Sequence, residues 1–232
     1  MNTRHLAVLA LVAAFTQASA QTYDLSPRFE KGTKSVYNLT FDIETPGQKV
    51  IYKSKLRNEI IDVKEDKSYI TASYQTDHVL VVDGKNAQSN AEELTEVTTY
   101  DKHGRPTAIG GDMTDGASFR VANLTSFIAP SKAVKIGESW SVSIKASEKD
   151  GTRDVTHRYK LLQITKINNA EVAEVQVNVA EDTKENPAST KGKVWVNIKT
   201  GETVRYQVDI KNMLVGPQYV NGSVTIEKTT SA

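Results

Sequence analysis

The amino-acid sequence predicts a mainly β protein built from antiparallel sheets, with a single helix between two groups of strands. Three observations support this fold class. Apolar and polar residues alternate along most of the chain, short turns rich in Gly and Asn separate the alternating runs, and only one segment has helical spacing. Two related five-strand units, forming a curved sheet or half barrel and linked by the helix, would account for this order.

The alternating runs have the pattern of half-buried strands, because successive side chains of a strand point to opposite faces. The clearest run places Tyr37, Leu39, Phe41 and Ile43 on one face. Similar runs predict strands over 95–101, 139–146, 172–179, 191–198, 204–210 and 223–227. Polar segments at 86–90 and 185–190 are expected to be loops.

Short turns join these runs. Lys199–Gly201 predicts a hairpin, and Gly104 marks a corresponding turn in the first half. Asn168 and Asn169 predict a tight turn, because Asn tolerates positive φ. Asp150–Gly151 is a type I′ hairpin signal, and Pro46–Gly47 predicts a further turn.

One segment, 115–128, departs from the alternation. Its apolar residues recur at spacings of four, three and four, which predicts one face of a helix that Pro130 ends. The alternative is an irregular loop, since several of its residues are weak helix formers. The residues of the apolar stripe are Ala117, Val121, Leu124 and Ile128.

The chain divides on this reading into a signal peptide at 1–20, a first β unit at 21–112, a linking helix at 113–130 and a second β unit at 131–232. The two units can also form one continuous domain. Tyr37 lies 103 residues before Trp140 in a similar strand, and Gly104 lies 97 residues before Gly201. A duplication would explain these offsets, although any meander with similar strand lengths produces such matches.

The first twenty residues have the pattern of a secretory signal. A charged head with Arg4 precedes an apolar stretch at 6–15, and small residues follow. We expect cleavage between Ala20 and Gln21. The apolar stretch is too short to span a bilayer, which takes about 20 residues, although a retained N-terminal anchor is the alternative. We therefore expect a periplasmic or secreted bacterial protein with no transmembrane helix in the mature chain.

Composition excludes several classes of site and partner. The chain has no cysteine, which rules out disulfides, thiolate metal sites and a cysteine nucleophile. Of 29 basic and 28 acidic residues, one basic residue, Arg4, lies in the signal, so the mature chain carries 28 of each. This balance gives no global attraction to nucleic acid, and we expect no nucleic-acid partner.

The search for catalytic and metal-binding residues finds no known constellation. His78, His103 and His157 lack the spacing of metal ligands, and neither a nucleophile elbow nor a P-loop is present. We expect His157 to be a satisfied core residue and His103 a turn residue. We thus predict no catalytic residues, no metal and no cofactor, and the sequence identifies no ligand-binding residue.

The carboxylates are expected to form solvated faces. They occur in short runs, which are usually exposed. The two runs are Glu92, Glu93 and Glu96, and Glu181 and Asp182.

Residues 127–140, FIAPSKAVKIGESW, carry a resemblance. The segment resembles the Pro-x-Lys-x-Val-x-x-Gly-Asp/Glu-Ser-Trp motif of uncharacterised exported bacterial β-rich domains, a family of unknown function. The matching residues are Pro130, Lys132, Val134, Gly137, Glu138, Ser139 and Trp140. The resemblance implies export and a β fold, and implies no reaction. In architecture alone the chain is distantly similar to lipoprotein-carrier-like half barrels, in which a curved sheet wraps a helix and holds acyl chains.

These observations predict an exported, non-enzymatic protein with a binding or structural role in the bacterial envelope. Its partner would be an apolar or lipid-like small molecule or an envelope protein. A cavity between sheet and helix, lined by Trp140 or Trp195, would favour ligand binding, and a filled core a structural role. The alternatives are an outer-membrane β-barrel and a hydrolase with an unrecognised carboxylate pair.

Overall fold

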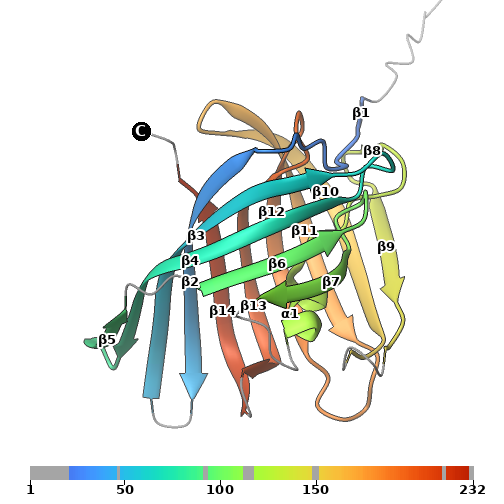
Figure 1. Cartoon of the computed structure of the whole chain (residues 1–232). Helices are drawn as coiled ribbons and strands as arrows, with labels where there is room; N and C mark the ends of the chain where they lie inside the picture. The colour runs from blue at the N-terminus through green and yellow to red at the C-terminus, as the bar shows by residue number, and fades with distance from the viewer. Residues whose placement is uncertain are drawn as a thin grey trace, which may run out of the picture.

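The computed structural model describes residues 21–45, 48–90, 94–111, 118–147, 152–215 and 218–229 and is dominated by one antiparallel sheet of twelve strands. A separate small sheet pairs β1 with β8. In this part of the chain the predicted fold class is confirmed: mainly β, antiparallel, with a single helix (Figure 1). The elements are β1 (Thr22–Tyr23), β2 (Lys34–Thr45), β3 (Gln48–Val63), β4 (Tyr69–Val82), β5 (Lys85–Asn90), β6 (Leu94–Tyr100), β7 (Pro106–Gly111), α1 (Ser118–Thr125), β8 (Val134–Lys135), β9 (Ser139–Ile144), β10 (Val155–Ile167), β11 (Ala170–Glu181), β12 (Ser189–Asn197), β13 (Thr203–Val215) and β14 (Gln218–Lys228).

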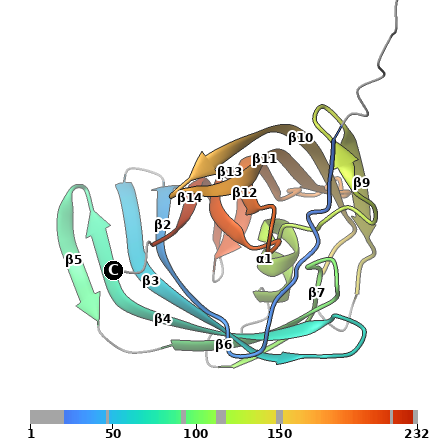
Figure 2. The same cartoon turned by 90° about the horizontal axis from the view of Figure 1, so that it is seen from above.

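The strand order of the large sheet is β7-β6-β4-β3-β2-β14-β13-β12-β11-β10-β9, and β5 pairs with β4. The last strand of the chain, β14, pairs with β2, so strands from both ends of the sequence form one sheet. The sheet curls around α1, as Figure 2 shows from above. It stays open, because its terminal strands β7 and β9 are not paired with each other.

The apolar core lies between α1 and the strands of the second half. Val175, Val177 and Val179 of β11 face inward with Val194 and Val196 of β12, and each is at most 1% exposed. The period-two pattern thus places β-branched side chains on the buried face. Full burial of one such side chain contributes roughly 1.5–3 kcal/mol.

Several predicted turns are confirmed, and two predicted loops are corrected. Asn168 and Asn169 both adopt positive φ in the β10–β11 turn. Residues 86–90 belong to strand β5, because the polar run pairs with β4 as an edge ribbon. Likewise, β12 begins at Ser189, inside the loop expected at 185–190. The turns predicted at Pro46–Gly47 and Asp150–Gly151 lie outside the described residues.

The helix ends earlier than predicted, and its buried face overlaps the predicted apolar stripe only in part. It ends at Thr125. The Ser126 N–H makes the last helical hydrogen bond, to the Ala122 carbonyl. Beyond it, the buried N–H of Ile128 donates to the Tyr159 hydroxyl instead of to a helix carbonyl. Its buried residues are Arg120, Asn123 and Leu124. Of the predicted apolar stripe, Leu124 is buried in the helix, Val121 is partly buried, Ile128 is buried beyond the helix end, and Ala117 lies outside the described residues.

The N-terminal segment 24–33 crosses the mouth of the curled sheet (Figure 2). Arg28 anchors it to the β12–β13 turn, since its guanidinium donates to the carbonyls of Ile198 and Lys199 at 3.1 and 3.0 Å, and its backbone N–H donates to Thr200. In the same turn Gly201 has a φ of 71°, and a Cβ on it would lie 2.2 Å from the carbonyl oxygen of Ser26. This close approach requires glycine.

We therefore expect Gly201→Ala to lower the free energy of unfolding by about 2–4 kcal/mol, measured by urea denaturation, because it combines left-handed backbone strain with a backbone clash. Gly32→Ala is the matched control. Gly32 also has positive φ, 86°, but a Cβ there meets nothing within 4 Å. Equal losses in the two variants would show that the segment does not pack closely on the turn.

Candidate functional site

The candidate site is a cavity of about 350 Å³ on the concave side of the sheet. Strands β2, β3, β4 and β6 form one wall, and residues of β13 and β14 continue it. The crossing segment contributes Pro27 and Phe29, and the chain after α1 contributes Ser126 and Phe127. The volume is within the range of small-molecule sites, about 300–1,000 Å³. We refer to this space as the concave cavity.

The lining of the concave cavity is largely aromatic and aliphatic, with hydroxyl and amide groups between. Among the described lining residues, none is Lys, Arg or His, and the charged side chains are Glu96 and Glu202. The apolar and aromatic members are Pro27, Phe29, Tyr37, Leu39, Phe41, Leu56, Ile60, Tyr69, Tyr100, Phe127, Tyr206 and Ile226.

The cavity tyrosines stay neutral at physiological pH. Burial raises the pKa of Tyr100 to about 12. It also raises the pKa of Tyr37 and of Tyr69 well above the usual value. Tyr69 stacks on Tyr100 with ring centroids 5.1 Å apart, and Phe29 meets Tyr69 edge-on at 4.9 Å. These side chains therefore present uncharged aromatic surface to the cavity.

Glu202 is held by the protein's own donors. Its Oε1 accepts hydrogen bonds from the hydroxyls of Ser35 and Tyr37, and the Lys228 ammonium contacts both carboxylate oxygens at 2.8 and 2.7 Å. This network ties the β12–β13 turn to β2 and β14. It also neutralises the charge of Glu202 at the cavity wall.

Glu96, on β6, has no such cation. Its Oε1 accepts a hydrogen bond from the Thr98 hydroxyl at 2.9 Å, and it forms no ion pair with any described residue. Burial raises the pKa of this carboxyl above its usual value. The sequence predicts Glu96 on a solvated face. That prediction is wrong, because the strand alternation turns Glu96 toward the same space as Tyr100.

A second cavity, also of about 350 Å³, lies between the β6–β7 turn and the edge strand β9. Its wall includes Asp101, His103 and Arg105 on one side. The other side is the segment 128–142, which contains most of the family-like motif, including Lys132, Glu138 and Trp140. Most of the motif residues therefore line the second cavity, between the two edges of the sheet, and none of them lines the concave cavity.

A buried polar cluster lies under α1. The Tyr159 hydroxyl accepts the Ile128 N–H at 3.1 Å, donates to the Ser126 carbonyl at 3.3 Å and lies 2.9 Å from His157 Nδ1. His157 is 0% exposed, as predicted, and burial lowers its pKa to about 4, so the ring is neutral at pH 7. Its Nε2, however, has no hydrogen-bond partner among the described residues, so the expected satisfied histidine is only half satisfied.

We expect Tyr159→Phe to lower the free energy of unfolding by about 1–3 kcal/mol, because the Ile128 N–H and His157 Nδ1 lose their partner in a buried site. Thermal and urea unfolding measure the change. Tyr74→Phe is the control, since Tyr74 contacts Arg57 through its ring, 4.7 Å away, and no hydrogen bond of its hydroxyl is present in the described chain. A loss below about 0.5 kcal/mol for Tyr159→Phe would contradict the proposed role of this hydroxyl.

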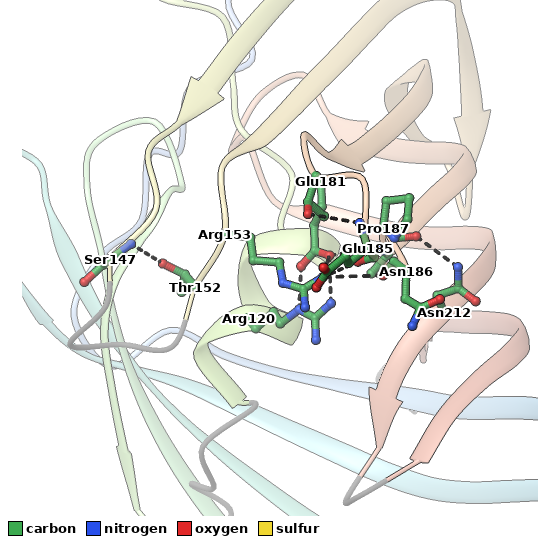
Figure 3. A network of polar contacts seen from close by, with 11 residues as sticks. Arg120, Ser147, Thr152, Arg153, Glu181, Glu185, Asn186, Pro187 and Asn212 are labelled. Carbon is green, nitrogen blue, oxygen red and sulfur yellow. Dashed lines mark hydrogen bonds and ion pairs between the residues drawn. The ribbon is translucent and has the colours of Figure 1, made fainter.

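An ion pair fixes α1 to the sheet (Figure 3). The Arg120 guanidinium donates to both carboxylate oxygens of Glu181, and the Glu181 side chain is 0% exposed. Glu181 also accepts the Ala188 N–H at 2.9 Å and pairs with Arg153 at 3.4 Å. The predicted solvated face is therefore wrong for Glu181. Asp182, its neighbour, is exposed, because it lies on the opposite face of the chain.

The remaining sequence candidates are dispersed. His103 lies in the predicted turn, where Asp101 Oδ1 accepts its N–H at 2.9 Å. His78 is 8% exposed and contacts the Tyr52 hydroxyl at 2.5 Å. Trp140 stacks on Tyr159 at 5.1 Å and lines the second cavity, and Trp195 lies under Arg205. Neither tryptophan lines the concave cavity.

Some residues with predicted roles lie outside the described ranges. Ala20, Glu92 and Glu93 lie outside the described ranges, and Gln21 is the first described residue. No group of three or more His, Cys, Asp or Glu side chains suited to a metal ion occurs among the described residues. No described helix has the length and apolar character needed to cross a membrane.

Comparison with known proteins identifies no family for the chain. No protein-family model matches the chain, and no curated protein matches it. Among solved structures, the chain is similar to a Bacteroides fragilis protein inferred to be exported and described as having a YmcC-like fold. The match has 10% identity and a TM-score of 0.36, and it covers 90% of this chain and 100% of that chain.

Proposed function

We propose that the protein is an exported, non-enzymatic binding protein whose concave cavity holds an apolar small molecule. The observation that carries the proposal is the cavity itself, about 350 Å³ of space whose wall includes twelve proline, aliphatic and aromatic side chains. An apolar ligand placed there gains roughly 25 cal/mol for each Å² of apolar surface removed from water. The signal-like segment at 1–20 supports export.

The arrangement of the lining supports binding rather than chemistry. The two carboxyl groups at the cavity wall differ in their partners. Glu202 forms an ion pair with Lys228, whereas Glu96 forms no ion pair with a described residue. The histidines lie elsewhere: none is among the residues lining the concave cavity in the described chain. The cavity hydroxyls of Ser35 and Tyr37 donate to Glu202, which leaves them engaged in holding the wall together.

Binding of N-phenyl-1-naphthylamine, a neutral apolar fluorophore, tests this function. The protein is prepared as residues 21–232, delipidated under denaturing conditions and refolded. We expect a saturable fluorescence increase at one site per chain, and we expect decanol to displace the fluorophore. A signal that rises linearly with probe concentration, or that decanol does not reverse, would refute apolar-ligand binding.

A further inference from the structure

We propose that the natural ligand of the concave cavity carries an amine, and that its ammonium group pairs with Glu96. This inference rests on the proposed function, because it specifies the polar end of the apolar ligand. Glu96 lines the cavity from β6, and its only described hydrogen bond comes from the Thr98 hydroxyl. A carboxylate at a cavity wall, without a protein cation, is a site that an external cation can complete.

The rest of the lining favours a cation over an anion. Among the described residues of the cavity wall, basic side chains are absent, and the Lys228 ammonium, which contacts the lining residue Glu202, is already bound to both of its carboxylate oxygens. A carboxylate or phosphate on the ligand would enter this space without a partner. Burying an unpaired charge is costly, whereas a hydrogen-bonded ion pair reduces that cost.

Ring faces near Glu96 add to this preference. Tyr100 lies four residues further along β6 on the same face, and Tyr69 is its direct partner on β4. The two rings stack at 5.1 Å, with Phe29 against Tyr69. The negative charge of Glu96 also acts on Tyr100, where it contributes to the raised phenol pKa. Glu96, Tyr69 and Tyr100 line the same cavity. Cations are attracted to aromatic ring faces within about 6 Å, so the rings would add to the attraction of an ammonium that approaches them.

A series of ligands with one alkyl chain and different head groups tests the inference. Decylamine, decanol and decanoate compete at pH 7 for bound N-phenyl-1-naphthylamine. The amine is then protonated, since alkylamines of the lysine type have a pKa of about 10.4. We expect decylamine to displace the fluorophore at a concentration about tenfold lower than decanol, which corresponds to about 1.4 kcal/mol, and decanoate to be the weakest.

Glu96→Gln identifies the group responsible. The variant keeps the size of the side chain and an acceptor oxygen for Thr98, so we expect it to bind decylamine no more than about twofold better than decanol. Glu171→Gln on β11 is the control, since Glu171 is exposed and is not among the lining residues. It should retain the amine preference.

The outcomes separate the two proposals. If decanol binds and decylamine binds no better, the amine assignment is wrong and the apolar binding function stands. If decylamine binds better but Glu96→Gln leaves that preference unchanged, Glu96 is not the recognition group and the inference is overturned. If no member of the series displaces the fluorophore, the binding function itself fails.

Discussion

Arg120→Met is expected to lower the free energy of unfolding by about 3–5 kcal/mol, the cost of leaving a buried charge without its main partner. Glu181 is fully buried, and the remaining contacts are the Ala188 N–H and Arg153 at 3.4 Å. Urea denaturation followed by circular dichroism measures the loss. Lys145→Met is the control, because the Lys145–Asp154 pair is exposed and such pairs contribute about 0–1 kcal/mol.

The contribution of the Arg120–Glu181 ion pair to stability depends on pH. Burial alone would raise the pKa of Glu181, but the hydrogen bonds from Arg120 and Ala188 and the charges of Arg120 and Arg153 outweigh it, so the pKa lies below the usual 4.5. A group whose pKa is lowered in the folded state stabilises the protein at pH values above its unfolded-state pKa. This stabilisation is lost as the pH falls through the folded-state pKa.

We therefore expect the difference in unfolding free energy between wild type and Arg120→Met to be largest near pH 7 and to shrink as the pH falls, because burial raises the pKa of Glu181 once Arg120 is removed and protonation then abolishes the unpaired buried charge. The double variant Arg120→Met/Glu181→Leu should be more stable than Arg120→Met alone, because no charge stays buried without a partner. A double variant less stable than either single variant would contradict this account of the helix anchor.

Ser73→Trp is expected to weaken binding of the fluorophore by about 30-fold or more, the equivalent of about 2 kcal/mol. Ser73 lies on the cavity face of β4, between Asn58 of β3 and Glu96 of β6. An indole at this position occupies the space that the ligand needs. Isothermal titration of the fluorophore measures the effect without interference from the added tryptophan.

Thr76→Trp is the matched control for Ser73→Trp. The residue is on the same strand, and the alternation of β4 places it on the opposite face from Ser73. It should bind the fluorophore as the wild type does. Unfolding measurements on both variants show whether overpacking, which costs about 1–3 kcal/mol, has disturbed the fold. Unchanged binding by a folded Ser73→Trp variant would place the fluorophore elsewhere.

The strands were predictable because their signal is local. Alternation along 37–43 and the Asn168–Asn169 turn each depend on neighbouring residues, and both appear in the structure. The helix face was not predictable in the same way. Arg120 is buried because Glu181, 61 residues away, neutralises it, and no local pattern encodes that pairing.

The candidate site depends on the curl of the sheet. Glu96 and Glu181 were assigned to solvated runs from their acidic neighbours, although alternation within each strand would have turned both inward. Alternation predicts the face of the strand on which a side chain lies, but it does not predict the shape of the space in front of that face. The concave cavity combines Phe29, Tyr69 and Tyr206 from distant parts of the chain, and only the closure of β14 onto β2 brings the two halves together.

A crystal structure of the protein grown with decanol is the most direct test of the central claim. The account predicts electron density for the alkyl chain in the concave cavity, in contact with Leu56, Tyr69 and Tyr206. Density for decanol only outside this space, or side chains that fill the cavity and leave no room for a ligand, would contradict it.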